Sequence, residues 1–189
     1  MNTPAHLIIG IAAFGRADAP KVTLAALIGA MLPDLSLYIM AGVSLFWLGL
    51  SDTHVFGTLY FSDAWQQVFA IDNSFVLWGI ALAVALWQRS AWAIALAGAA
   101  LAHIALDFPF HSDDARMHFW PLTDWKFHSP ISYWNSDEGA GWFGPIEMIC
   151  VLALTIFSLR RFPQIWVRIT VSVLCLLQLV PFVSWYLFF

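Results

Sequence analysis

The sequence predicts an all-α, polytopic integral membrane protein, on the basis of its hydropathy, its few charged residues and its long apolar segments. The chain of 189 residues is 61% hydrophobic and 11% charged, and its mean hydropathy is +0.76. A soluble domain is about a quarter charged. Several apolar stretches approach the roughly 20 residues that a helix needs to cross a bilayer. We therefore expect one helical transmembrane domain over residues 1–189.

The apolar segments predict a bundle of about five or six membrane segments. They cover residues 4–15, 22–50, 73–88, 91–108, 144–160 and 163–188. In the first segment Thr3 is a suitable N-cap and Pro4 fits the first helical position. This helix rises only about 18 Å and is not expected to span fully. In the second segment Pro33 and Gly42 interrupt the pattern, which predicts two pieces with a kink at Pro33.

Two connections are distinctive in composition. Residues 57–70 are aromatic with scattered polar groups, which is typical of an amphipathic helix at the membrane interface. Residues 109–143 form a long polar connection on the outer side, rich in tryptophan: Trp120, Trp125, Trp134 and Trp142. Tryptophans in such a position anchor a protein at the interface. The alternative is a rigid lid that excludes water from a site.

Charge and cysteine usage exclude some classes of partner. The net charge is −4, and no basic tail is present, so we do not expect nucleic acid as a partner. Cys150 and Cys175 lie in apolar runs and are interpreted as small core residues without a redox motif. No basic region precedes residues 4–15, so we expect a helix of the mature protein there and not a cleaved signal.

The basic residues predict an orientation. Six of them fall in three turns that we expect on the cytoplasmic side: Arg16, Lys21, Arg89, Arg160, Arg161 and Arg168. Arg116 and Lys126 are then outside. The outer acidic residues are Asp52, Asp63, Asp72, Asp113, Asp114, Asp124, Asp137 and Glu138. By the excess of cytoplasmic Lys and Arg, both termini lie on the outer side of a bacterial inner membrane.

This orientation places polar residues of separate segments at one depth. Asp34 and His103 each lie about 12 residues from a cytoplasmic helix start, which corresponds to roughly 18 Å. His6 is about 10 residues from Arg16, at nearly the same level. Polar groups therefore converge in the outer half of the membrane, where ionisable residues indicate function.

A run of histidines and carboxylates carries the strongest signal. At helical spacing, five residues form one stripe: His103, Asp107, His111, Asp114 and His118. They supply the ligand types of a divalent transition metal, zinc above all. The plain alternative is a helix leaving the membrane, where polar residues appear with the water. It accounts for Asp114 and His118 better than for His103 and Asp107, which precede the exit.

The residues suggest separate roles. We expect His6, Asp34, His103 and Asp107 as metal ligands. We expect His111 or Asp114 as a general base, and His118 as a proton shuttle or a ligand of a phosphate oxygen. Glu147 is a further catalytic candidate, although an acid in a first helical turn is also favoured by the helix dipole.

Three short motifs resemble those of the predicted membrane-bound metal-dependent hydrolases, a family with a LexA-regulated member. They are Ala5-His6, Pro33-Asp34-Leu-Ser36 and His103-Ile-Ala-Leu-Asp107. Ser36 stands where the family has a second Asp, and Asp72-Asn73-Ser74 stands where it has Thr-His-Ser. The resemblance covers roughly residues 3–120. It implies a divergent member with a site at His6, Asp34, His103 and Asp107. His111, Asp114 and His118 are candidates to replace the missing ligands.

These observations predict a metal-dependent hydrolase that acts on a lipid-like or lipid-linked ester or phosphoester at the outer half of the bilayer. A second hypothesis is a non-catalytic accessory or assembly subunit of a larger membrane complex that keeps a degenerate polar or metal site. A third is an ion or proton path. The cytoplasmic halves of the segments lack comparable polar residues, which argues against the third.

Overall fold

The computed structural model describes residues 1–133 and 140–188, and these residues form helices and no strand. The elements are α1 (Thr3–Phe14), α2 (Pro20–Gly42), η1 (Val43–Trp47), α3 (Asp52–His54), η2 (Val55–Leu59), α4 (Asp63–Asp72), α5 (Phe75–Trp87), α6 (Ala91–Asp107), η3 (Phe108–Phe110), α7 (Ala140–Arg161) and α8 (Ile165–Phe188). The all-α prediction is confirmed.

Several helices have the length and composition of membrane spans. Four helical stretches in the described residues qualify: Pro20–Trp47, Asp63–Trp87, Ala91–Phe110 and Gly141–Arg161. Thr3–Phe14 and Ile165–Val180 are apolar but shorter. These four candidate spans are compatible with a helical membrane protein, and the expected total of five or six membrane segments stays a prediction.

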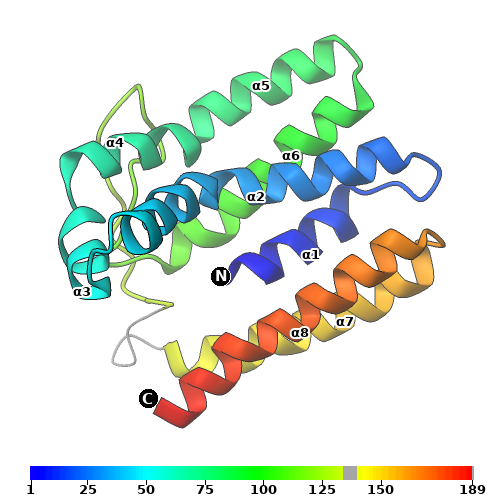
Figure 1. Cartoon of the computed structure of the whole chain (residues 1–189). Coiled ribbons are helices and arrows are strands. Elements are labelled where there is room, and N and C mark those ends of the chain that lie inside the picture. The colour runs from blue at the N-terminus through cyan, green and yellow to red at the C-terminus, as the bar shows by residue number, and fades with distance from the viewer. Residues whose placement is uncertain (134–139, 189) are drawn as a thin grey trace.

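The short helix α1 lies at the centre of the molecule. It runs between a layer formed by α2, α5 and α6 and the antiparallel pair α7 and α8 (Figure 1), and it contacts α2, α6, α7 and α8. The C-terminal end of α1 is bound to α7, because the Arg161 guanidinium donates hydrogen bonds to the carbonyls of Ala12 (2.7 Å) and Gly15 (2.8 Å). Cations at a helix C-terminus satisfy its free carbonyls. A helix too short to span is therefore held inside the bundle.

Small residues allow α2 and α6 to pack closely. Their shared core consists of Val22, Ala26, Ala30, Ala95 and Ala99. A Cβ atom on Gly29 would lie 2.0 Å from the carbonyl oxygen of Leu96. Helices in membranes associate through such small residues because backbones can then approach closely. This contact sets the distance between the two helices that carry Asp34 and His103.

The prediction that residues 22–50 form two pieces at Pro33 is wrong. α2 is continuous from Pro20 to Gly42 and is followed by the π-helical turn η1. Neighbouring side chains bond to carbonyls around the proline. His103 bonds to the carbonyl of Ala30 (2.7 Å), and Asn73 donates to that of Pro33 (3.1 Å). The carbonyl that Pro33 leaves without a helical donor is that of Gly29, where α2 packs closely on Leu96 of α6. Neighbouring helices make a proline tolerable in a membrane helix.

Two predicted helix starts also differ. Thr3 is the first residue of α1 and not its cap; the preceding Asn2 is the N-cap, without a side-chain bond. Residues 57–70 do not form one helix, because η2 ends at Leu59 and Ser62 caps a new helix, α4, by accepting from the amide of Trp65. Polar caps of this kind compete with helix continuation.

The described part of the connection after α6, up to residue 133, contains no long helix. Hydrogen bonds from the amides of Ser129 and Tyr133 to the carbonyls of His111 (3.0 Å) and Phe110 (2.9 Å) fold it back over its own start. α7 begins at Ala140, inside the predicted connection. Trp134, Asp137 and Glu138, which the sequence analysis used, lie outside the described residues. The interfacial role of the tryptophans stays a prediction.

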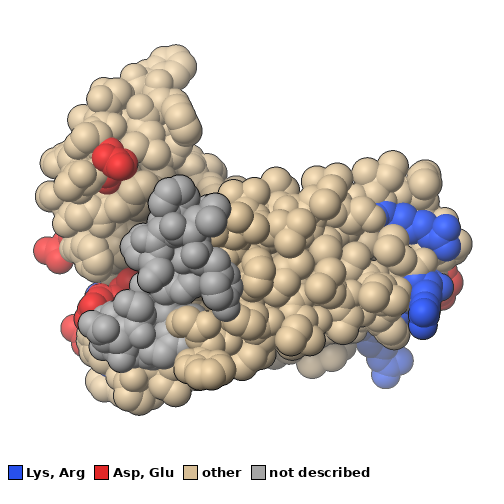
Figure 2. Space-filling view, turned by 90° about the horizontal axis from the view of Figure 1, so that it is seen from below, with Lys and Arg blue, Asp and Glu red and all other residues tan. Residues whose placement is uncertain are grey.

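Charged residues separate along the long axis of the molecule. Figure 2 shows the visible Lys and Arg side chains at one end and most of the visible Asp and Glu side chains at the other. The α1–α2, α5–α6 and α7–α8 turns, whose sequences carry six of the basic residues, lie at one end of the molecule (Figure 1). This separation is the pattern from which the orientation was predicted.

Candidate metal-binding site

Two histidines and an aspartate from different helices meet in the interior. His6 of α1 and His103 and Asp107 of α6 each offer a ligand atom, and these atoms lie within 4.8 Å of one another. The exposed fractions are 1% for each histidine and 8% for Asp107. The imidazole rings stack with centroids 3.6 Å apart. Among the described residues this is the group with the composition and spacing of a metal site.

The Asp107 carboxylate lies at the Nε2 edges of the two stacked rings. Its Oδ1 is 2.9 Å from His6 Nε2, and its Oδ2 is 3.3 Å from His103 Nε2. His103 and Asp107 are one helical turn apart on α6, so they lie on the same face of the helix. The predicted depth match between His6 and His103 therefore corresponds to direct contact.

Asp34 of α2 joins the cluster from the other side. Its Oδ1 lies 3.6 Å from His103 Nε2. Its Oδ2 accepts a hydrogen bond of 2.5 Å from the Thr3 hydroxyl, which also contacts the Tyr38 hydroxyl at 2.8 Å. The four residues predicted as ligands are thus brought together by three helices, with Asp34 at the edge of the group.

The hydrogen bonding of His103 suits either a proton or a metal ion at Nε2. Its Nδ1 lies 2.7 Å from the carbonyl oxygen of Ala30 and must donate there, because a carbonyl only accepts. A neutral ring then has a lone pair at Nε2, which is buried, lacks a hydrogen-bond partner and faces the carboxylates of Asp34 and Asp107. Either a proton on the ring or a metal ion removes the repulsion. A backbone carbonyl that orients a histidine is a usual partner of a metal ligand.

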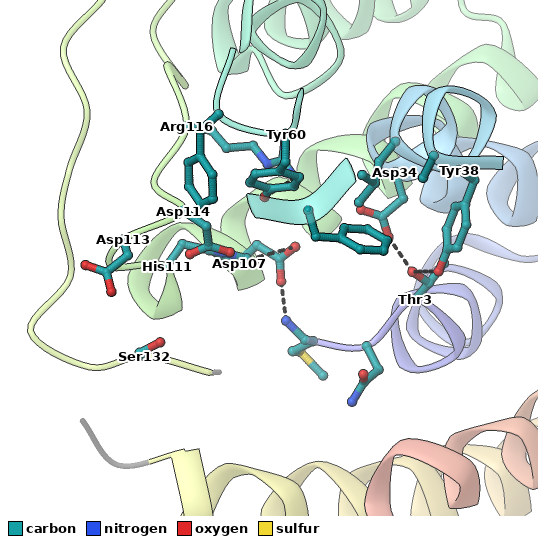
Figure 3. A pocket seen from close by; sticks show the side chains of 16 residues that line it. Thr3, Asp34, Tyr38, Tyr60, Asp107, His111, Asp113, Asp114, Arg116 and Ser132 are labelled. Carbon is teal, nitrogen blue, oxygen red and sulfur yellow. Dashed lines mark hydrogen bonds and ion pairs between the residues drawn. The ribbon is translucent and has the colours of Figure 1, made fainter. Parts of the chain in front are cut away.

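Asp107 is also compensated within the chain. The amino group of Met1 donates to its Oδ1 (Figure 3). His6 Nε2 contacts the same oxygen, while His6 Nδ1 is buried without a hydrogen-bond partner. A buried carboxylate needs such partners. The cluster can therefore be held together as an ion-pair network or by a metal.

The stripe from His103 to His118 is not one helix. α6 ends at Asp107, a 3-10 turn covers Phe108–Phe110, and His111 has extended backbone angles. Pro109 explains the end, because it lacks an amide hydrogen and restricts the residue before it. The prediction of a continuous helical face is wrong beyond Asp107.

His111 and Asp114 nevertheless lie beside the cluster. His111 Nδ1 is 2.6 Å from Asp114 Oδ2, and its Nε2 is 3.7 Å from Asp107 Oδ2. Burial lowers the pKa of His111, but the two carboxylates outweigh it and raise the pKa above its ordinary value. Burial raises the pKa of Asp114, and its hydrogen bond with His111 reverses this to a lowered pKa. His111 and Asp114 form an ion pair at the rim of the cluster.

A cavity of about 790 Å³ opens over these residues. Its charged lining residues include Asp34, Asp107, His111, Asp114 and Arg116, which Figure 3 shows around the cavity. Its aromatic and aliphatic lining residues include Leu37, Tyr38 and Ala41 of α2 and also Phe56, Tyr60 and Phe61. The volume is in the range of small-molecule sites. The cluster is thus accessible from a cavity whose lining combines charged and apolar side chains.

His118 lies apart from the cavity lining, contrary to its predicted catalytic role. It packs among the rings of Phe75 and Phe108, and its Nδ1 is 3.0 Å from the carbonyl oxygen of Asn73. Burial lowers its pKa to about 4, so the ring is neutral near pH 7. A neutral histidine in an aromatic cluster serves to pack the connection against α5.

Glu147 also lies apart from the cavity lining, and hydrogen bonds account for its burial. Its carboxylate accepts from the amide of Asn2 (2.7 Å), the side chain of Asn2 (2.9 Å) and Gln178 (2.8 Å). Tyr133 donates a fourth bond. This network joins α1, α7, α8 and the long connection. The predicted catalytic role of Glu147 finds no support in this position.

The substitution Glu147→Ala should destabilise the protein and leave metal binding intact. It removes the acceptor of several buried donors, and each unsatisfied donor costs about 1–3 kcal/mol. Thermal unfolding in detergent should show a lower midpoint, and the metal content should be unchanged. Asp124→Ala, at an exposed position, is the control. Loss of metal from a stably folded Glu147→Ala variant would restore Glu147 to the site.

The sequence analysis missed several residues of this site. Thr3 and Tyr38 lie against Asp34, and Tyr60 and Arg116 line the cavity. Hydroxyl groups in apolar helices are too common to single out. Arg116 did carry a signal, because it is one of two basic residues in the predicted outer segments.

No protein-family model matches this chain, and no curated protein or solved structure matches it. Fold and site together define a class: an α-helical membrane protein with a buried cluster of two histidines and an aspartate beside an amphiphilic cavity.

Proposed function

We propose that this protein is a membrane-embedded, metal-dependent hydrolase that acts on a lipid-like or lipid-linked ester or phosphoester. The observation that carries the proposal is the buried group of His6, His103 and Asp107, whose ligand atoms lie within 4.8 Å of one another. Asp107 and Asp34 connect this group to the cavity, since both line it. Histidine and carboxylate ligands suit zinc.

Each residue has a distinct part in this proposal. His6, His103 and Asp107 hold the metal, with Asp34 as a further ligand from α2. When bound, the metal supplies Lewis acidity to water and to the scissile group. The Ala30 carbonyl fixes the ring of His103. Asp114 bonds to His111 Nδ1 and orients the ring so that Nε2 faces Asp107. In that position His111 accepts and donates protons in the reaction. One water is consumed, the ester bond is cleaved, and an acid and an alcohol are released.

The same proposal includes a location. The separation of charge along the molecule (Figure 2) supports an inner membrane with the basic end in the cytoplasm and the site in the outer half. Both termini are then on the outer side. The apolar wall of the cavity supports a lipid as the partner of the site.

A second candidate is a non-catalytic subunit of a larger membrane complex. It is favoured by the compensation of the carboxylates within the chain, since Thr3 donates to Asp34 and His6 contacts Asp107. Purification in a mild detergent distinguishes the two. A stable larger assembly without metal supports the subunit, and an active single chain with metal excludes it.

Hydrolytic activity tests the first candidate. We expect the purified chain to cleave at least one member of a panel of fluorogenic acyl esters and phosphoesters, to lose activity with EDTA and to regain it with zinc. Asp107→Asn should abolish turnover, because it removes a carboxylate charge at nearly constant shape. Asp124→Asn, at an exposed position, is the matched control. Activity that survives both EDTA and Asp107→Asn would contradict the proposal.

A further inference from the structure

Arg116 is a buried cation beside the cavity. It is 7% exposed, and its guanidinium lies 4.2 Å from the centre of the Phe69 ring. Nη2 donates to the Tyr60 hydroxyl at 3.1 Å, whereas Nη1 is buried and has no hydrogen-bond partner. Figure 3 shows Arg116 and Tyr60 side by side, on the same side of the cavity as Asp114.

A buried guanidinium ordinarily has a carboxylate partner, because an uncompensated charge in the interior is costly. Within the described residues no carboxylate oxygen lies within 4.0 Å of Arg116. The nearest candidate in sequence, Asp114, has its Oδ2 bonded to His111. Phe69 and Tyr60 hold the guanidinium in place without neutralising it. The Arg116 guanidinium is thus fixed in position, and its unpartnered Nη1 can donate to an anion.

The chemistry of Arg116 favours a phosphate group. A guanidinium presents its N–H donors in a rigid fork that matches the oxygens of phosphate. Four carboxylates also line the cavity: Asp34, Asp107, Asp113 and Asp114. Asp114 is paired with His111, Asp107 contacts both histidines of the cluster, Asp34 accepts from Thr3, and Asp113 is exposed to solvent.

The apolar part of the cavity lining suits an apolar chain. It includes Leu37, Tyr38 and Ala41 of α2 and, from the segment before α4, Phe56 and Phe61. Tyr38 is 51% exposed and Phe61 is 52% exposed, so this wall continues to the surface of the molecule. α2 belongs to a candidate membrane span. The acyl chain of a lipid bound here would therefore stay in apolar surroundings, and only the headgroup would lie outside the hydrocarbon.

We propose that the cavity binds an amphiphile with a phosphate headgroup, whose anionic oxygens bond to Arg116 and whose acyl chain lies along α2 and the segment from Phe56 to Phe61. This inference rests on the proposed function and names its substrate class: a phosphate-bearing lipid. Arg116 recognises the headgroup and places it beside Asp107 and His111.

Binding is measured on the full chain in detergent after metal removal with EDTA, by isothermal titration calorimetry. The probes are dihexanoyl phosphatidic acid, dihexanoylglycerol and inorganic phosphate. We expect the first to bind about 10- to 100-fold more tightly than either of the others, because a charge-assisted hydrogen bond contributes about this factor. Equal affinity for dihexanoylglycerol overturns the role of the phosphate. Equal affinity for inorganic phosphate overturns the role of the chain.

Variants assign the effect to the residue. Arg116→Gln should remove the preference for phosphatidic acid over dihexanoylglycerol, and Arg116→Lys should keep part of it, since charge remains but the fork is lost. Arg160→Gln, an exposed position in the basic C-terminal turn of α7, is the matched control and should bind as the wild type does. If Arg116→Gln does not fold, Tyr60→Phe decides. It removes the hydroxyl that accepts from Nη2 and holds the guanidinium in place, so binding should weaken several-fold. An unchanged preference in these variants overturns the proposal.

Metal removal separates this inference from the proposed function. Arg116-dependent binding by a chain that never binds metal would support the phosphate-lipid site and refute the metal-dependent hydrolase. Metal binding without a preference for phosphatidic acid would support the metal site of the proposed function and refute the phosphate-lipid site.

Discussion

Protein in which both His103 and Asp107 are replaced by alanine should contain no bound divalent metal, whereas the wild-type chain should bind one ion per molecule. The reason is geometric. Asp107 contacts both histidines of the cluster, at 2.9 Å from His6 Nε2 and 3.3 Å from His103 Nε2, so the double substitution leaves only His6 and Asp34. Two ligands do not hold a metal that requires three or four. Inductively coupled plasma mass spectrometry of purified protein measures the content.

The control for this experiment is a pair of the same residue types outside the cluster. His54→Ala with Asp124→Ala removes an exposed histidine and an exposed aspartate, and the metal content should equal that of the wild type. The single Asp107→Asn variant tests the same point without creating a cavity. Metal-free wild-type protein purified in the presence of zinc, or an unchanged content in the double variant, would refute the metal site and favour the ion-pair network.

The second large effect concerns the contact between α2 and α6. Gly29→Ala should lower the unfolding midpoint strongly and weaken metal binding as well. The added Cβ would lie 2.0 Å from the Leu96 carbonyl oxygen and 2.8 Å from its Cα, and backbone atoms of a packed helix cannot turn aside. Overpacking of this kind costs about 1–3 kcal/mol or more. Since α2 carries Asp34 and α6 carries His103, separating the helices also separates the ligands.

Gly79→Ala in α5 is the matched control, because nothing lies within 4 Å of the added Cβ. It should be neutral or stabilising by up to about 1 kcal/mol, as alanine is the better helix former. Thermal unfolding and zinc titration of both variants provide the comparison. If Gly29→Ala unfolds and binds zinc as Gly79→Ala does, then the close approach of α2 and α6 is not what positions the site.

Local sequence rules succeeded where the membrane or the chain itself set the constraint. Apolar runs placed the helices, since every backbone group in lipid must be bonded within the helix. They failed at Pro33, where the neighbouring side chains of His103 and Asn73 bond to backbone carbonyls and the helix continues. They failed again between residues 57 and 70, where Ser62 starts a new helix. Both outcomes depend on partners or caps that hydropathy does not encode.

The candidate site was partly predictable for a similar reason. Orientation and helical rise gave a common depth for His6, Asp34 and His103, and the structure brings these residues together with Asp107. The functional role of His118 was inferred from its spacing along the stripe, and that of Glu147 from its position at the start of an apolar segment. In the structure both residues have structural contacts: His118 packs in an aromatic cluster, and Glu147 is part of a hydrogen-bond network.

Hydropathy and the distribution of Lys and Arg suffice for the class of this protein, its helical segments and the level at which its polar residues gather, because these follow from the cost of placing charge and free backbone groups in lipid. Which of those residues touch is a matter of packing. α1 is placed against α2, α6, α7 and α8, and that placement brings His6 against His103. The end of α6 at Asp107 turns His111 and Asp114 back toward the cluster and directs His118 away from it. Contacts between segments far apart in the chain depend on side-chain shape in three dimensions, and for that reason the buried cluster and its cavity are properties of the tertiary structure.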